Sequence, residues 1–144
     1  MKKKETSVSW SKLIKELQVR CQEQDVSLTE LTEWIRALVE RIEEREFDYY
    51  VTSGKVSRYP KQKLDVAILS DNFVYGFTVF QDSRETGVYP LSGFRQYREE
   101  ISKGNISVFL FYDEVNSLYI EDEITNSAKL RKFARQILSR VWDM

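Results

Sequence analysis

Histidine is absent from this sequence of 144 residues, and cysteine occurs only once. Histidine is the side chain whose ordinary pKa suits proton transfer near neutral pH, and it is also the commonest metal ligand in proteins. Without it, most schemes of acid–base catalysis, nucleophile activation and zinc binding lose their central residue. The sequence therefore favours a protein that is not an enzyme and that carries no cofactor and no metal.

Other scarce features exclude further classes of protein. The single Cys21 cannot form an internal disulfide, and the five glycines do not cluster before a lysine as they do in a phosphate-binding loop. No apolar run approaches the roughly 18 residues that a membrane-spanning helix needs. The basic segment 1–5 is not followed by an apolar stretch of signal-peptide length, so we expect a cytoplasmic protein.

The residues that are abundant indicate a folded domain with a large aromatic core. The chain has three Trp, eight Tyr and eight Phe, and 42% of its residues are hydrophobic. Its net charge of −1 excludes a globally basic nucleic-acid binder. Its length fits a single compact unit, with a helical segment over 1–46 and a β-rich segment over 47–144.

Two apolar stripes at helical spacing predict an amino-terminal helical hairpin. The first stripe is Trp10, Ile14, Leu17 and Cys21, and the second is Leu28, Leu31, Ile35, Leu38 and Ile42. Ser27 and Glu30 form a capping-box pattern, so the second helix is expected to begin near Leu28. We expect these stripes to pack on each other, on the rest of the domain, or on a second copy of the chain. The second stripe is therefore the candidate interface of a homodimer.

From Phe47 onward the pattern changes to strands rich in β-branched and aromatic residues. The predicted strands are Phe47–Ser53, Leu64–Leu69, Phe73–Phe80, Ile106–Tyr112 and Ser117–Ile120, and a turn is expected over Gln81–Gly87. The connections are short, which favours antiparallel pairing. A final amphipathic helix from about Ser127 carries the stripe Leu130, Phe133, Ile137 and Val141. The predicted class is α+β: an antiparallel, aromatic-rich sheet or half-barrel closed by a carboxy-terminal helix and preceded by the helical hairpin.

The segment Phe94–Ile101 decides between alternative folds. It could be a helix, because Phe94, Tyr97 and Ile101 are spaced by three and four residues. It could also continue a strand that begins at Val88, and Pro90 and Gly93 favour this strand with a bend.

If this segment is a strand, residues 69–137 resemble a bacterial pleckstrin-homology-like domain. The resemblance lies in the strand start Ser70-Asp71-Asn72-Phe73, in the Tyr89-Pro90-Leu91 step, and in the final amphipathic helix. It implies an open β-sandwich plugged by that helix, and a scaffold that binds lipids, peptides or other proteins.

If the segment is a helix, two other families are similar in element order. One is the PD-(D/E)xK nucleases, with Asp65 as the first metal-binding acid, but Thr78 and Phe80 stand where an acid and a lysine are expected, so this likeness implies an inactive relative. The other is the small acidic chaperones of type III secretion. The hairpin also resembles the first two helices of a helix-turn-helix domain, but no recognition helix follows, so sequence-specific DNA binding is not expected.

One basic segment is a candidate ligand site. Lys55, Arg58, Tyr59, Lys61 and Lys63 place four cations and an aromatic between the first two strands, with no acid among them. Such a loop can hold an anionic ligand or an anionic lipid surface through charge-assisted hydrogen bonds. The function that the sequence favours is a non-catalytic binding or adaptor module that engages a protein partner.

Overall fold

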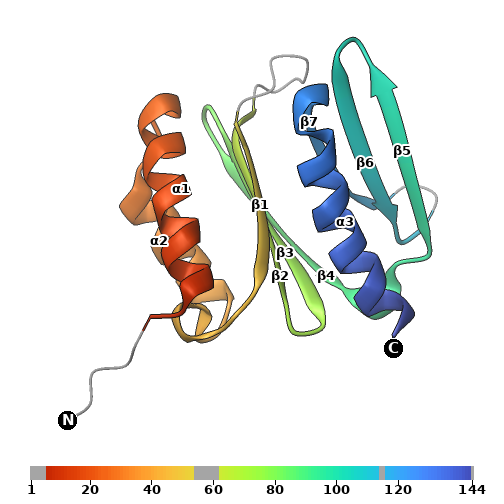
Figure 1. Cartoon of the computed structure of the whole chain (residues 1–144). Helices are drawn as coiled ribbons and strands as arrows, with labels where there is room; N and C mark the ends of the chain where they lie inside the picture. Colours follow the sequence, from red (N-terminus) through yellow and green to blue (C-terminus); the bar gives the residue numbers. More distant parts are fainter. Residues whose placement is uncertain (1–5, 54–61, 114–115, 144) are drawn as a thin grey trace.

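The computed structural model describes residues 6–53, 62–113 and 116–143 (Figure 1). A pair of helices covers one face of a four-stranded sheet, and a three-stranded sheet lies across its other face. The last helix fills the opening between the two sheets along one side. The predicted α+β class is confirmed: an amino-terminal helical pair, antiparallel strands and a closing helix, with the strands divided between two sheets.

The amino-terminal helices are α1 (Val8–Gln24) and α2 (Leu28–Leu38), and each begins at a serine cap. Ser7 Oγ and Ser27 Oγ accept hydrogen bonds from the backbone N–H groups three residues later, at 3.0 Å and 3.2 Å. These bonds satisfy amide groups that have no partner within the helix. The predicted start of the second helix is confirmed.

The second apolar stripe does not lie on a single helix, as the sequence predicted. The helix α2 ends at Leu38, and Ile42 lies in the short 3-10 helix η1 (Ile42–Glu44). The break arises because Val39 takes an extended backbone and Arg41 a left-handed one, with φ of 57°. Ile42 is buried all the same, so the turn continues the apolar face by a different backbone path.

The first sheet has strand order β1-β2-β3-β4, and all of its pairs are antiparallel. Its strands are β1 (Asp48–Ser53), β2 (Gln62–Ser70), β3 (Phe73–Phe80) and β4 (Arg84–Pro90). The predicted turn over Gln81–Gly87 is wrong in its second half, because Arg84 pairs with Val79 and Gly87 pairs with Gly76. This strand is an exposed edge with polar residues, so it lacks the apolar alternation that marks a covered strand.

The segment that decides the fold is a strand. After β4 the chain makes the 3-10 turn η2 (Leu91–Gly93) and continues as β5 (Gln96–Ser102), which pairs antiparallel with β6 (Asn105–Phe111). The helical alternative for Phe94–Ile101 is therefore wrong. The turn at η2 interrupts the strand predicted from Val88, and there the chain passes from the first sheet to the second.

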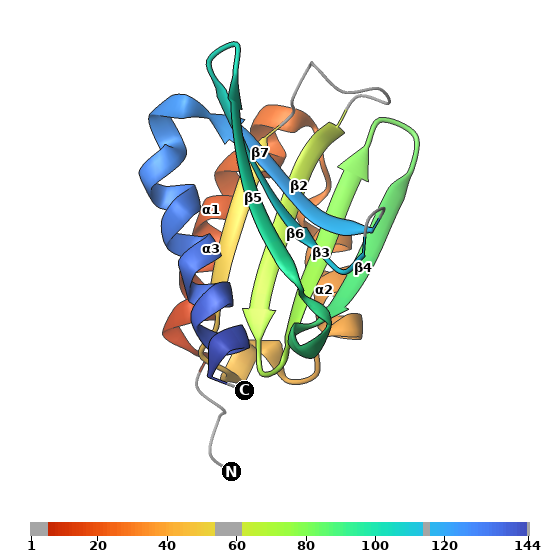
Figure 2. The ribbon, with the colours of Figure 1, turned by 90° about the vertical axis from the view of Figure 1, so that its right-hand side faces the viewer.

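The second sheet has strand order β5-β6-β7, with β6 at Asn105–Phe111 and β7 at Ser117–Glu123. Its strands cross over those of the first sheet (Figure 2). The short helix η3 (Ile124–Asn126) leads into α3 (Ser127–Trp142), which begins where the sequence predicts.

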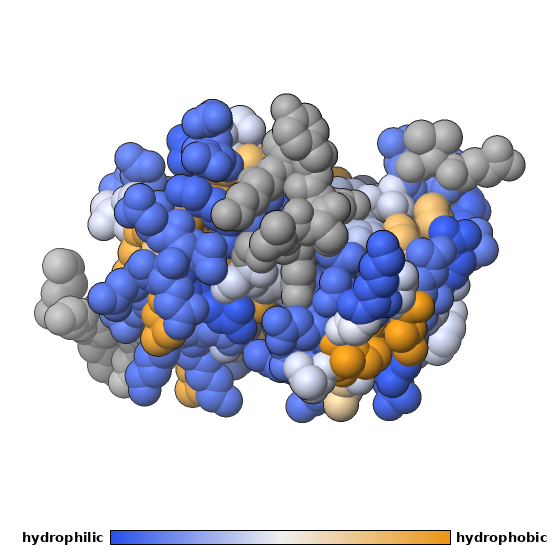
Figure 3. Space-filling model, turned by 90° about the horizontal axis from the view of Figure 1, so that it is seen from above, coloured by the Kyte–Doolittle hydropathy of each residue, from blue (hydrophilic) through white to orange (hydrophobic). Residues whose placement is uncertain are grey.

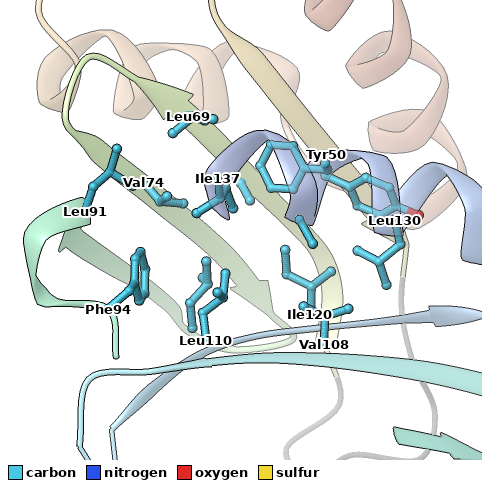
Figure 4. Close-up of a cluster of buried hydrophobic side chains, with 14 of the residues drawn as sticks. Tyr50, Leu69, Val74, Leu91, Phe94, Val108, Leu110, Ile120, Leu130 and Ile137 are labelled. Atoms are coloured by element: carbon cyan, nitrogen blue, oxygen red, sulfur yellow. The ribbon is translucent and has the colours of Figure 1, made fainter. Parts of the chain in front are cut away.

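Two hydrophobic cores lie on opposite faces of the first sheet. The helix-side core combines both amino-terminal helices with β1, β2 and β3; its fully buried members include Leu13, Leu17, Leu31, Ile35, Leu64, Val66, Ile68 and Phe77. The inter-sheet core draws on both sheets and α3 (Figure 4); it includes Tyr50, Leu69, Val74, Leu91, Phe94, Val108, Leu110, Ile120, Leu130 and Ile137. Burial of apolar surface on both faces explains why the central strands are apolar on both sides.

A buried polar contact also links the two sheets. The Tyr50 hydroxyl on β1 donates a hydrogen bond of 2.6 Å to Asp122 Oδ2 on β7. Burial raises the pKa of Tyr50, and the bond to the Asp122 carboxylate raises it further, so the phenol stays protonated as a donor.

Candidate functional site

Most of the predicted basic loop falls outside the described residues: Lys55, Arg58, Tyr59 and Lys61 lie within 54–61. Lys63 lies on β2, and its Nζ donates a hydrogen bond of 3.4 Å to the backbone oxygen of Asp25 at the turn between α1 and α2. Anion binding by this loop stays a prediction.

The predicted homodimer interface lies largely within this chain's own core. Leu31, Ile35 and Ile42 are buried against the first sheet, and Leu28 packs partly against the same core. Leu38 is 39% exposed. A second copy that contacted the three buried residues would first have to displace the sheet that covers them, so self-association through this stripe stays a prediction.

Two further residues singled out from the sequence have clear surroundings. Cys21 is buried as expected on the α1 stripe, and burial raises the pKa of its thiol, which keeps it unreactive. Asp65 on β2 accepts a hydrogen bond of 3.0 Å from Thr78 Oγ1 on β3. Within the described ranges, no three Asp, Glu or Cys side chains are grouped to hold a metal ion.

A groove between α3 and β5 is the site that the structure adds. Its volume is about 480 Å³, and we call it the α3–β5 groove. It is lined by Tyr97, Glu99, Arg131, Arg135, Leu138, Ser139 and Trp142. The helix and the strand run in opposite directions along it (Figure 1).

One flank of α3 forms a wall of this groove. Arg131, Arg135, Leu138 and Trp142 recur at spacings of four, three and four residues, so they share one side of the helix. The opposite, inward face carries Leu130, Phe133 and Ile137 into the inter-sheet core. Core packing therefore fixes the direction in which the groove-lining side chains project.

The other wall is an edge strand. β5 pairs only with β6, and among the described residues no backbone hydrogen bond occupies its outer edge along Gln96–Ser102. Such an edge carries amide and carbonyl groups in the geometry that accepts a further strand.

A polar network spans the middle of the groove. Glu99 accepts a hydrogen bond of 2.6 Å from the Tyr97 hydroxyl and one of 3.0 Å from Arg131 Nε. The bond from Tyr97, followed by the bond and charge of Arg131, lowers the pKa of Glu99. Burial raises the pKa of Tyr97, and its hydrogen bond to the Glu99 carboxylate raises this pKa further. The network joins β5 to α3 and keeps the two walls in register.

Exposed apolar side chains lie on both elements that bound the groove. Trp142, at the end of α3, is 76% exposed, and Ile101, near the end of β5, is 61% exposed. Ile124 is also exposed, and its N–H binds the oxygen of Gly104 in the turn that follows β5. Figure 3 shows hydrophobic atoms gathered on the side of the molecule that holds α3 and the second sheet. Apolar surface of this kind is typical of an interaction site.

The outer face of the second sheet continues this surface beyond β5. Phe109 stacks on Phe111 with ring centroids 5.7 Å apart, and its ring lies 4.8 Å from that of Tyr119. The Arg98 guanidinium of β5 lies over the two phenylalanine rings at 5.2 Å and 5.3 Å. No helix of the described chain covers this face, in contrast to the first sheet (Figure 1). Aromatic and arginine side chains are the types that most often carry binding energy at interfaces.

One residue of the groove carries a signal that is visible in the sequence, although the groove itself is not. Trp142 lies outside the predicted stripe Leu130, Phe133, Ile137 and Val141, and an aromatic residue off the apolar face of a helix is a signal for a contact surface. The rest needed the fold, because Tyr97 and Leu138 are brought together only when α3 packs beside β5.

No protein-family model matches this sequence, and no curated protein matches it significantly. Within the described residues, no helix is both long and apolar enough to cross a membrane.

Proposed function

We propose that this protein is a binding module that accepts an extended segment of a protein partner along β5. The observation that carries the proposal is that the edge of β5 with no strand partner runs beside a groove lined by the exposed Trp142, with the exposed Ile101 further along the same strand. Strand addition supplies backbone hydrogen bonds for affinity, while pockets beside the edge select alternate side chains of the added segment.

The surroundings of the edge define the partner segment. Residues that alternate toward α3 would meet Tyr97, Leu138 and Trp142, which favours large apolar side chains. Arg135 forms no ion pair with a described residue, whereas Arg131 pairs with Glu99. An acidic side chain of the partner is therefore favoured opposite Arg135, in the middle of the groove. Residues that alternate outward would meet Arg98 and the phenylalanine rings beneath it.

The arrangement of the sheets also supports the pleckstrin-homology-like family as a proposal. An open sandwich plugged by a carboxy-terminal helix is what that resemblance implies, and α3 occupies the opening between the two sheets. The layouts proposed for a nuclease or a secretion chaperone both needed a helix where β5 lies. A binding role is therefore favoured over those alternatives.

The test is a selection of displayed random peptides on the full chain, followed by NMR titration of a synthetic version of the best binder. We expect the amide shifts of Gln96–Ser102 to move and Trp142 fluorescence to shift to shorter wavelength. The double variant Ile101→Lys, Trp142→Ala should weaken binding at least about tenfold, equivalent to about 1.4 kcal/mol.

The matched control is Val19→Lys, which places the same charge on a comparably exposed apolar position of α1. This control should leave the affinity unchanged. The proposal is wrong if selection yields no binder, if the perturbed amides lie away from β5 and α3, or if Val19→Lys weakens binding as much as the double variant.

A further inference from the structure

A second groove lies on the other flank of α3, independent of the α3–β5 groove. It is bounded by α1, by the start of β1 and by α3, and its volume is about 420 Å³. We call it the α1–α3 groove. Its lining includes the cations Lys12, Lys129, Lys132 and Arg140. Along α3 it runs from Lys129, near the start of the helix, to Arg140, near its end.

The cations converge from two helices that are distant in sequence. Lys12 projects from α1, while Lys129, Lys132 and Arg140 share a side of α3 at spacings of three and eight residues. The packing of both helices on β1 fixes this arrangement. Like charges that line one groove repel one another, and a bound anion would reduce this repulsion.

Two carboxylates also line the groove, and both are already engaged. Glu46 accepts a hydrogen bond of 2.7 Å from Ser9 Oγ. Asp48 accepts one of 3.1 Å from Gln136 Nε2, and its other oxygen lies 4.0 Å from Arg140. Outside the groove lining, Glu16 lies 3.6 Å from Lys129.

The unbalanced charge belongs to two lysines. Lys12 and Lys132 form no ion pair with any described residue, and they flank the groove from opposite helices. The lining as a whole carries four cations and two carboxylates. With Glu16, which pairs with Lys129, four cations face three carboxylates, so a net positive charge remains that an anionic group would balance.

We infer that the α1–α3 groove binds a phosphate group, held between Lys12 and Lys132. The volume exceeds that of a single phosphate, so the ligand has room for a pyrophosphate or for a phosphorylated ring. Ammonium groups bind phosphate through charge-assisted hydrogen bonds, and the exposed position makes the affinity fall as salt rises. The same chemistry occurs in soluble phosphorylated compounds and in lipid headgroups.

The experiment is an NMR titration of the full chain with inorganic pyrophosphate at low ionic strength, together with thermal unfolding in the same buffer. We expect shifts at the amides of Val8, Ser9, Lys12 and Gln136, and a rise in melting temperature that follows ligand occupancy. The double variant Lys12→Gln, Lys132→Gln should weaken pyrophosphate binding about tenfold or more. The control double variant Lys15→Gln, Lys103→Gln removes the same charge from exposed lysines outside the groove and should bind as the wild type does.

A parallel co-sedimentation with phosphatidylcholine vesicles containing phosphatidylinositol bisphosphate separates the two sources of phosphate. Vesicle binding that depends on Lys12 and Lys132 indicates a headgroup, and pyrophosphate binding without vesicle binding indicates a soluble ligand. The inference is overturned if pyrophosphate leaves the groove amides unshifted, or if both double variants lose affinity equally, because charge alone would then account for binding. Neither result bears on peptide binding at β5.

Discussion

At the scale of single residues, Glu99 is the side chain on which the α3–β5 groove depends. It lies on β5 between the two walls and receives hydrogen bonds from Tyr97 on its own strand and from Arg131 on α3. Among the described residues, no other hydrogen bond or ion pair joins the middle of β5 to α3. Protonation of this carboxylate would remove its charge from the pair with Arg131 and weaken the acceptor for Tyr97.

The pH dependence of stability should reveal this contact. The pKa of Glu99 is lower in the folded chain, so its contribution to stability is present above the unfolded pKa and is lost as the pH falls through the folded value. We expect Glu99→Gln to destabilise the protein at pH 6 and to reduce the loss of stability between pH 6 and pH 3.5. Urea unfolding at the two pH values measures both effects.

The control is Glu100→Gln, which removes the same charge from the same strand without touching Tyr97 or Arg131. An equal reduction in both variants would show that the general loss of carboxylate charge, and not the contact at Glu99, governs the acid response.

At the scale of elements, the turn η2 determines how the two sheets meet. It lies between β4 and β5, and three stacked rings surround it: Tyr89, Phe94 and Tyr112. Tyr112 donates a hydrogen bond of 3.0 Å to the Pro90 oxygen, which holds its ring against the turn. The Tyr112 ring occupies the space that a side chain at position 93 would need, which explains why this residue is glycine.

Substitution of Gly93 tests this packing. A Cβ atom there would lie 2.1 Å from Tyr112 Cε1, so Gly93→Ala forces the ring out of its stack. We expect a loss of about 1–3 kcal/mol, the usual range for overpacking, measured by urea unfolding. Gly76→Ala is the matched control in β3, where the nearest atom would lie at an ordinary 3.7 Å. Similar losses of unfolding free energy in both variants would mean that the Tyr112 ring moves aside at little cost.

The elements differ in how far the sequence alone predicted them. Helices and covered strands were predictable because one face of each is apolar at a regular period. Phe94–Ile101 was ambiguous because Phe94, Tyr97 and Ile101 fit a helical stripe, while Tyr97 and Ile101 also fall on one face of a strand. The first half of β4 was missed because an exposed edge strand needs no apolar alternation. The α3–β5 groove was not predictable, since it exists only where two elements distant in sequence pack together.

At the scale of the whole molecule, the helical pair and the two sheets share buried surface. The first sheet contributes alternate side chains to the helix-side core and to the inter-sheet core. A disturbance of either core therefore reaches the same strands. We expect the described elements to unfold together and not as separate domains.

Two substitutions test this cooperativity. Leu17→Ala opens the helix-side core and Ile137→Ala the inter-sheet core, and both side chains are fully buried. Each should cost about 2–5 kcal/mol and shift a single transition, with coincident midpoints from circular dichroism and tryptophan fluorescence. Val19→Ala, at an exposed position of α1, should change the midpoint little. Two separated transitions in either core variant would indicate that the helical pair folds independently.

The division into two cores also sets an order of assembly during synthesis on the ribosome. Every buried member of the helix-side core lies between Trp10 and Phe77, so this core can close while the second sheet is still being made. The inter-sheet core needs Leu130, Phe133 and Ile137, which are translated after the strands of both sheets. Until then the inner faces of both sheets stay open to solvent and to other nascent chains. The nascent chain is therefore most prone to aggregate before α3 is made, and the packing of α3 between the sheets removes this exposed surface.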